Sequence, residues 1–198
     1  NNYSIRRIKM AVKTMVQKTG TGLYDIGWHE LVISSAVYDT WKTPDGKSKR
    51  YVDLHFEGYP DNMNLRIYEA KNRETDVEFK IANLFRYACA GIIDVLNDPT
   101  GKNPVIQYDD EAENLVGTRI NVFFYKEKAD DGNEYSRPFD TVAPVEQVTE
   151  HVTWTADQVV RLKVAAEKNF AKVKGDKVVH TTNHTAKSTT TSDAEIPF

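Results

Sequence analysis

Aromatic and cationic residues recur at alternate positions in several strand-like stretches of this sequence. Alternate residues of a strand share one face, so the pattern predicts a surface that carries rings and positive charges together. Rings stack on exposed nucleobases and cations attract phosphates, which is the chemistry of a site for single-stranded nucleic acid. The candidate residues are Tyr38, Trp41, Lys42, Lys47, Lys49, Arg50, Tyr51, His55, Arg66, Tyr68, Arg119, Phe123 and Tyr125.

The aromatic members of this set have a second interpretation. Aromatic side chains are common in strands for packing reasons alone, so the rings could lie beneath the N-terminal segment, a second helix or a partner subunit. The first interpretation requires the rings of Tyr51, Tyr68 and Phe123 to face outward. The residues that alternate with them are then the core, and these are Val52, Leu54, Ile120 and Val122.

Five stretches have the composition of strands. Residues 30–41, 49–56, 64–69 and 117–126 alternate apolar and polar side chains, and residues 134–142 should return as the second strand of a hairpin. Pro44, Asp45 and Gly46 supply turn chemistry between the first two stretches. Residues 130–133 do the same before the last one.

Two helices are predicted from capping-box patterns. Thr75-x-x-Glu78 should open a helix that runs to about Leu96, and its apolar residues cover more than one stripe, which is typical of a largely buried helix. Thr155-x-x-Gln158 should open a second helix that reaches about Val173.

Three strands, a helix and two strands in this order predict an OB-fold. This fold is a five-stranded Greek-key barrel, here expected with the helix between strands 3 and 4, so the fold class is mainly β with α. We expect residues 1–152 to form this domain with an N-terminal arm, 153–174 the C-terminal helix and 175–198 a disordered tail. Residues 3–19 fit either a short amphipathic helix or an extended arm.

The charge and composition limit the class of protein. A net charge of −3 is not that of a generally basic nucleic-acid binder. Residues 1–73, however, hold twelve Lys and Arg against eight Asp and Glu, a balance of +4, and one positive face is sufficient for binding. No apolar run reaches the ~18–20 residues of a membrane span, and the single cysteine, Cys89, lies in an apolar stretch. We therefore expect a soluble, cytoplasmic protein with an inert thiol.

The sequence ends with acidic residues followed by Ile-Pro-Phe. This ending resembles the C-terminal tip of bacterial and phage single-stranded DNA-binding proteins, and a divergent phage-type member is the better comparison. The resemblance implies protection of single-stranded DNA in replication, recombination and repair, in the cytoplasm of a bacterial host. It also implies docking of replication or recombination proteins by Asp193, Glu195, Ile196, Pro197 and Phe198.

This sequence departs from the family in its basic linker, with Lys172, Lys174, Lys177 and Lys187. That composition argues against the tail as a strong electrostatic competitor of DNA. The oligomeric state stays open, including a homo-oligomer.

The motifs of common enzyme classes are missing from the sequence. There is no Gly-x-x-x-x-Gly-Lys-Ser/Thr loop, no dinucleotide fingerprint and no paired nucleophile and base. His180 and His184 lie in the tail without further metal ligands, and the acidic run at residues 109–113 is interpreted as a solvated loop. We expect no enzyme, no cofactor and no metal. The rival hypotheses are an OB-like interaction or virion module, a strand-annealing protein and, last, a metal-dependent nuclease.

Overall fold

The computed structural model describes residues 24–97, 104–129 and 132–175. This part of the chain is mainly β with two helices. The N-terminal segment that fits either a helix or an arm, and the docking tip, lie outside the described residues.

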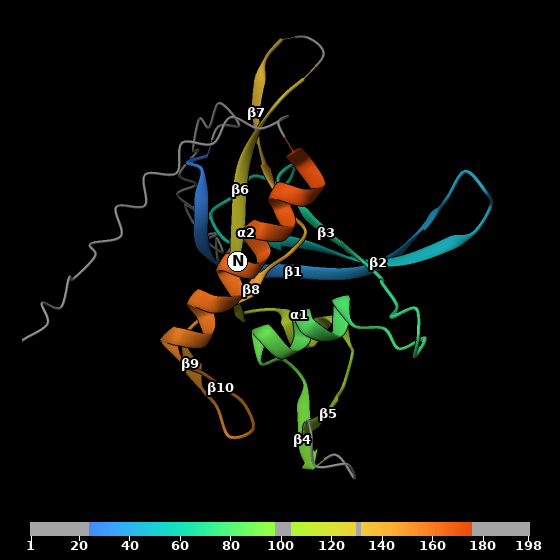
Figure 1. The fold of residues 1–198 in the computed structure, drawn as a ribbon, viewed down its shortest axis with the longest axis vertical. Coiled ribbons are helices and arrows are strands. Elements are labelled where there is room, and N and C mark those ends of the chain that lie inside the picture. The colour runs from blue at the N-terminus through green and yellow to red at the C-terminus, as the bar shows by residue number, and fades with distance from the viewer. Residues whose placement is uncertain (1–23, 98–103, 130–131, 176–198) are drawn as a thin grey trace, which may run out of the picture.

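The main sheet is antiparallel and has the strand order β3-β2-β1-β6-β7 (Figure 1). A short strand, β8, continues the pairing of β7 along β6. The strands span Gly27–Lys42 (β1), Ser48–Phe56 (β2), Leu65–Tyr68 (β3), Arg119–Lys128 (β6), Glu134–Pro138 (β7) and Ala143–Pro144 (β8). The alternation in the sequence thus located β1, β2, β3 and β6, whereas the predicted return strand at 134–142 is shorter and ends at Pro138.

The long strand β1 serves two partners. Its first half pairs with β6 and its second half pairs with β2, and the register shifts between Ile33 and Ser35. A bulge of this kind bends a strand. The end of β1 and the beginning of β2 therefore extend away from the rest of the sheet as a projecting hairpin (Figure 1).

Helix α1 (Lys80–Ala88) is shorter than the sequence predicted. Thr75 does not cap it; instead the carboxylate of Glu78 accepts hydrogen bonds from the backbone N–H groups of Lys80, Ile81 and Ala82, at 2.7, 2.8 and 3.0 Å. The helix ends where Cys89 adopts a left-handed conformation with φ of 52°. The prediction of a helix to Leu96 was wrong.

The residues after α1 form a strand instead. Strand β4 (Ile92–Asn97) pairs with β5 (Pro104–Tyr108) in a separate two-stranded sheet. Ile92, Ile93 and Val95 are β-branched and favour a strand. Gly91 has a φ of +60°, and a Cβ there would lie 2.4 Å from the carbonyl oxygen of Asp109, so only glycine fits this turn.

The core lies between α1 and the inner face of the sheet. Ile81, Leu84 and Phe85 of α1 pack there against apolar residues of all three N-terminal strands and of β6. Val52, Leu54, Ile120 and Val122 are fully buried in this core, as predicted.

Helix α2 (Ala156–Lys174) packs on the other side of the sheet, over β6 (Figure 1). Its capping box between Thr155 and Gln158 is present as predicted. A 3₁₀ turn, η1 (Ala112–Leu115), precedes β6, and the two-residue strands β9 (Gln147–Val148) and β10 (Thr153–Trp154) precede α2.

Candidate nucleic-acid interface

The register of β1, β2 and β3 divides the predicted site residues between two faces. Trp41 pairs with Lys49, Tyr51 pairs with Tyr68, and Asp53 pairs with Arg66. Directly paired residues project to the same side of an antiparallel sheet, as do alternate residues along one strand. We call the resulting surface the open face, and its predicted members are Trp41, Lys49, Tyr51, His55, Arg66 and Tyr68.

Three rings form a connected cluster on the open face. The Tyr68 ring lies 5.2 Å from the Tyr51 ring and 6.2 Å from the Trp41 ring, centroid to centroid. The guanidinium of Arg66 lies 5.3 Å from the centre of the Tyr51 ring. Trp41 is 47% exposed and is therefore the ring that a ligand can reach most easily.

Tyr51 packs inside this cluster and presents little of its ring to solvent. It is only 6% exposed, and its hydroxyl donates a hydrogen bond of 2.8 Å to the carboxylate of Asp39. That bond raises the pKa of Tyr51. The pKa of Asp39 is lowered, first by the backbone N–H of Thr40 and then by the Tyr51 hydroxyl. The expectation that Tyr51 faces solvent was wrong, although the strand face was assigned correctly.

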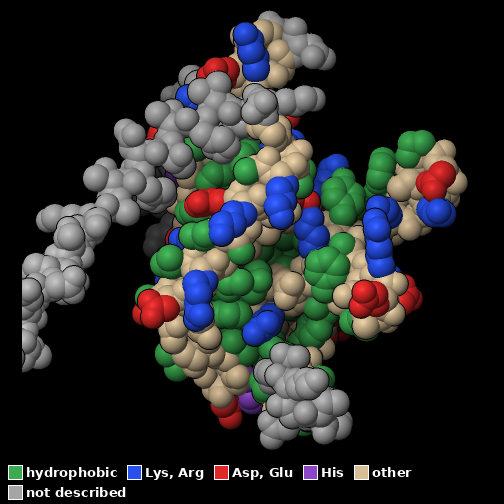
Figure 2. All heavy atoms as spheres, viewed as in Figure 1, with side chains coloured by type: hydrophobic (Ala, Val, Ile, Leu, Met, Phe, Trp, Pro, Cys, Tyr) green, Lys and Arg blue, Asp and Glu red, His purple; other side chains and the backbone are tan. Residues whose placement is uncertain are grey.

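Cations and carboxylates alternate around the rings. Arg66 pairs with Asp53 at 3.2 Å, whereas Lys49 is exposed and has no ion pair among the described residues. At the tip of the hairpin, Lys47 pairs with Asp45 at 3.2 Å, and both side chains are exposed. Figure 2 shows hydrophobic side chains and Lys or Arg side chains side by side on this projecting hairpin.

Tyr38, Lys42 and Arg50 belong to the other face of the hairpin. The guanidinium of Arg50 lies 3.6 Å from the centre of the Tyr38 ring and pairs with Asp110 at 2.9 Å. Lys42 is exposed on the same side by alternation. The predicted residues of the hairpin are neighbours in sequence, but they lie on its two opposite faces. On this second face, Asp110 of the acidic run at residues 109–113 neutralises the charge of Arg50.

The two predicted aromatic residues of β6 lie beneath α2. Phe123 and Tyr125 are 3% and 5% exposed, and their rings lie 5.3 and 5.0 Å from the ring of Phe170. The prediction that they are displayed was wrong, and packing beneath the second helix was the correct alternative. Arg119 is exposed at the start of β6 and pairs with Glu30 at 2.7 Å.

The coverage by α2 defines which part of the sheet a ligand can reach. Phe170 and the half-buried Trp28 lie over the β6 half, with the indole N–H of Trp28 donating to Glu167 at 2.7 Å. Figure 1 shows no described element over the outer side of the projecting hairpin. Val37, which the sequence analysis did not select, adds an apolar side chain there that is 59% exposed.

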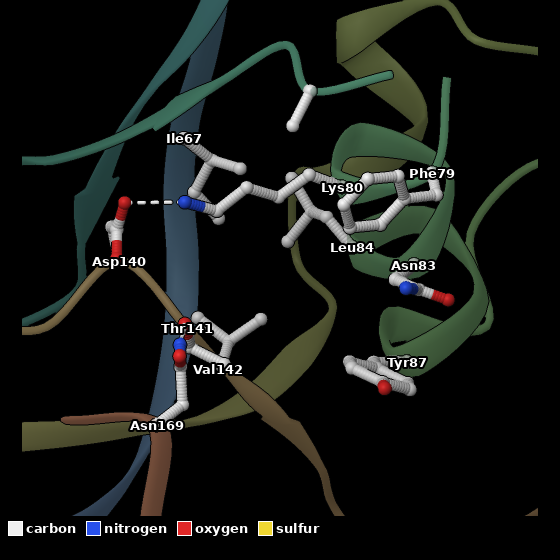
Figure 3. Close-up of a pocket in the computed structure, with 11 residues that line it drawn as sticks. Ile67, Phe79, Lys80, Asn83, Leu84, Tyr87, Asp140, Thr141, Val142 and Asn169 are labelled. Atoms are coloured by element: carbon white, nitrogen blue, oxygen red, sulfur yellow. Dashed lines mark hydrogen bonds and ion pairs between the residues drawn. The ribbon is translucent and has the colours of Figure 1, made fainter. Parts of the chain in front are cut away.

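A separate hollow of about 380 Å³ lies between α1 and the segment that leads to β8. Figure 3 shows Phe79, Lys80, Asn83 and Tyr87 of the α1 segment on one side and Asp140, Thr141 and Asn169 on the other. Lys80 and Asp140 form an ion pair across it. Because its one cation is neutralised, this hollow is a poor site for an anionic ligand.

Among the residues that the structure describes, no helix has the length and apolar composition needed to cross a membrane. The docking tip predicted at residues 193–198 is outside the described residues. The sequence matches no protein-family model and no curated protein.

Proposed function

We propose that this protein binds single-stranded DNA on the open face, with little base preference. The observation that carries the proposal is the exposed Trp41 ring in contact with the Tyr68–Tyr51 pair. Lys49 pairs with Trp41 in the strand register and forms no ion pair with any residue that the structure describes. Rings of this kind stack on any base, and cations follow the phosphates of the strand.

The topology is consistent with an OB-like sheet. Three antiparallel strands precede α1, β6 and β7 follow it, and β1 bridges the two groups. In OB-folds, the face of strands 2 and 3 and the loop between strands 1 and 2 bind oligonucleotides, and the open face occupies these positions. The edges at β3 and β7 line one hollow of about 340 Å³, with Arg66 on one side and Arg137 on the other. No pairing of β3 with β7 exists among the described residues, so we propose an OB-like sheet that is open there.

The charges on the open face favour a single strand over a duplex. Stacking requires unpaired bases, and Asp39 and Asp53 place two carboxylates among the rings. In a duplex the bases are paired and cannot stack on these rings. The phosphates of both strands are still repelled by the two carboxylates, so we expect a duplex to bind more weakly.

The rival function is an OB-like module that binds other proteins or forms part of a virion. Its support is the net charge of −3 and the number of carboxylates on the open face. Aromatic rings with one exposed member also suit a protein partner.

Fluorescence anisotropy with labelled oligo-dT and with a labelled duplex, at two salt concentrations, separates these functions. We expect tighter binding to oligo-dT, and affinity that falls with salt by about 0.7 log units per log unit for each phosphate neutralised. Absence of binding at low salt, or equal affinity for the duplex, would contradict the proposal and favour the rival.

We further propose that residues 193–198 recruit replication or recombination proteins, on the sequence resemblance alone. Ile196 and Phe198 offer apolar anchors, and Pro197 limits the conformations that are lost on binding. Deletion of residues 193–198 should leave oligo-dT affinity unchanged and abolish capture of such proteins. A variant with the same six residues in scrambled order is the control for composition, and it should fail to capture them as well.

A further inference from the structure

A hollow of about 220 Å³ lies between the end of α1 and the first turns of α2, away from the open face. Its lining residues are Arg86, Tyr87, Trp154, Gln158, Arg161 and Leu162. It brings together two guanidinium groups and two aromatic rings from three separate elements of the chain.

The two guanidinium groups have no carboxylate partner within the described part of the chain. Nε of Arg86 is buried and makes no hydrogen bond there. Nε of Arg161 donates to the carbonyl oxygen of Asp157 at 3.3 Å, and this bond leaves the terminal nitrogens of Arg161 unused by described residues. Two uncompensated positive charges beside one hollow favour an anionic ligand.

Trp154 holds Arg86 in place. The guanidinium lies 4.9 Å from the centre of the Trp154 ring, and the indole N–H donates to the carbonyl oxygen of Arg86 at 3.1 Å. The Tyr87 ring stands nearly perpendicular to the Trp154 ring, at 5.4 Å between centroids and 74° between planes. The hollow therefore combines a fixed planar donor, suited to bidentate contact with phosphate, with apolar ring surface.

The positive charge of the hollow continues along α2. Arg161, Lys168 and Lys172 are spaced by seven and four residues, which places them on one stripe of the helix. All three are exposed, and none forms an ion pair with a described residue. Figure 2 shows Lys and Arg side chains along this part of the surface.

The remaining cations of α2 are turned toward the sheet. Lys163 lies 5.5 Å from the centre of the Trp28 ring, and Lys174 lies 5.1 Å from that of Tyr125. The solvent-facing stripe is thus a separate row of charges that extends well beyond the hollow. A row of this length matches a polyanion better than it matches a short acidic peptide with two or three carboxylates.

We propose that the hollow holds one nucleotide unit of a single-stranded nucleic acid whose phosphates continue along the stripe of α2. Arg86 and Arg161 contact a phosphodiester, and the half-buried Tyr87 contacts the adjoining base or sugar. Trp154 is only 4% exposed and lies behind Arg86, which it holds in position. This inference rests on the proposed function, since it gives the same strand a second contact region on the protein.

The three tryptophans report on three separate places, which makes the inference testable in the full chain. Trp41 lies on the open face, Trp154 lines the hollow, and Trp28 is held by Glu167 beneath α2. In an isotope-labelled protein, oligo-dT should move the indole N–H signals of Trp41 and Trp154 and leave that of Trp28 in place.

The exposed side chains supply the variants. Arg161→Gln and Lys168→Gln together should raise the oligo-dT concentration needed to move the Trp154 signal by about tenfold, since each removes a charged contact. The Trp41 signal should still move to the same position at saturating oligo-dT, because its stacking site is intact. Arg86→Gln removes the guanidinium inside the hollow and leaves the α2 stripe intact, and it should also weaken the response of the Trp154 signal to oligo-dT. Lys128→Gln, exposed on β6, is the control and should change neither response.

The outcomes separate the two proposals. Movement of Trp41 alone overturns the second contact and leaves the proposed function intact, whereas movement of neither overturns both.

Two further arms use inorganic phosphate and a peptide with the sequence of residues 192–198. If phosphate moves Trp154 as strongly as oligo-dT at equal concentration, the hollow is a simple anion site. If the peptide moves Trp154 and oligo-dT does not, the hollow is a peptide site. Either result overturns the inference.

Discussion

The ring of Phe170 in α2 lies 5.3 Å from the ring of Phe123 in β6, in an edge-to-face arrangement. Phe139 and Tyr125 contact the same Phe170 ring, at 5.1 and 5.0 Å. A single side chain of α2 thereby contacts both rings on the outer side of β6. Since Phe123 and Tyr125 are buried, a DNA strand cannot stack on the rings of β6, whereas Trp41 of the projecting hairpin is 47% exposed.

Replacement of Phe170 or Phe123 with Ala should reduce the free energy of unfolding by about 3–5 kcal/mol, as expected for a buried Phe. The double variant should lose less than the sum, because the two rings contact each other. Urea denaturation measures both quantities. Val160→Ala, at a position 59% exposed on α2, is the control and should change stability little.

The folded Phe123→Ala variant should retain its oligo-dT affinity. If its affinity fell while its stability stayed the same, Phe123 would be a stacking ring after all and the packing explanation would be wrong.

The strands could be located from the sequence because alternation directly reflects a half-buried strand. Val52, Leu54, Ile120 and Val122 were assigned to the core on that basis, and all four are fully buried. Alternation cannot say whether the other face meets water. The burial of Phe123 depends on the docking of Phe170, a residue distant in sequence, and no local pattern around Phe123 encodes that contact.

The helix after β3 was overextended for a different reason. Apolar residues recur from Val77 to Val95 with only single polar residues between them, and such a pattern does not show where a helix gives way to a strand. The signals that divide it are the left-handed Cys89 and the turn at Gly91. A lone glycine is tolerated in a helix, so the sequence alone does not show that Gly91 ends this one. The structure shows it, because the carbonyl oxygen of Asp109 lies where a Cβ of residue 91 would be.

Trp41→Ala should weaken binding to oligo-dT by ~1–3 kcal/mol, the usual contribution of one stacked base. Stability should change by no more than about 0.5 kcal/mol, because the side chain is half exposed. Phe79→Ala is a matched control, since Phe79 has the same exposed fraction of 47% but precedes α1. Equal effects of the two variants on oligo-dT affinity would show that the open face is not the stacking surface.

Tyr38→Phe should keep or increase the stability of the protein at neutral pH. The Tyr38 hydroxyl is buried without a hydrogen-bond partner among the described residues, so its removal relieves a desolvation cost. Burial raises the pKa of Tyr38 to about 12, and the nearby Arg50 lowers it by less.

The pH dependence of this effect has a definite sign. A folded-state pKa above the unfolded value of about 10 means that the neutral hydroxyl is favoured by folding. Its contribution is complete below about pH 10 and is lost as the pH rises toward about 12. The stability gap between Tyr38→Phe and the unmodified protein should therefore widen over that range, as measured by denaturation at several pH values. A constant gap would mean that Tyr38 is not the group responsible.

Lys49→Gln should reduce the salt dependence of oligo-dT binding. Lys49 lies opposite Trp41 in the hairpin register and has no ion pair among the described residues, so its charge is available to a phosphate beside a stacked base. Loss of one phosphate contact lowers the slope of log affinity against log salt by about 0.7 for a single strand. Anisotropy titrations over a series of salt concentrations measure this slope directly. Lys128→Gln removes another exposed charge, on β6, and should leave the slope unchanged. A similar reduction in both variants would indicate attraction by the overall charge of the protein, without a defined position for the strand on the open face.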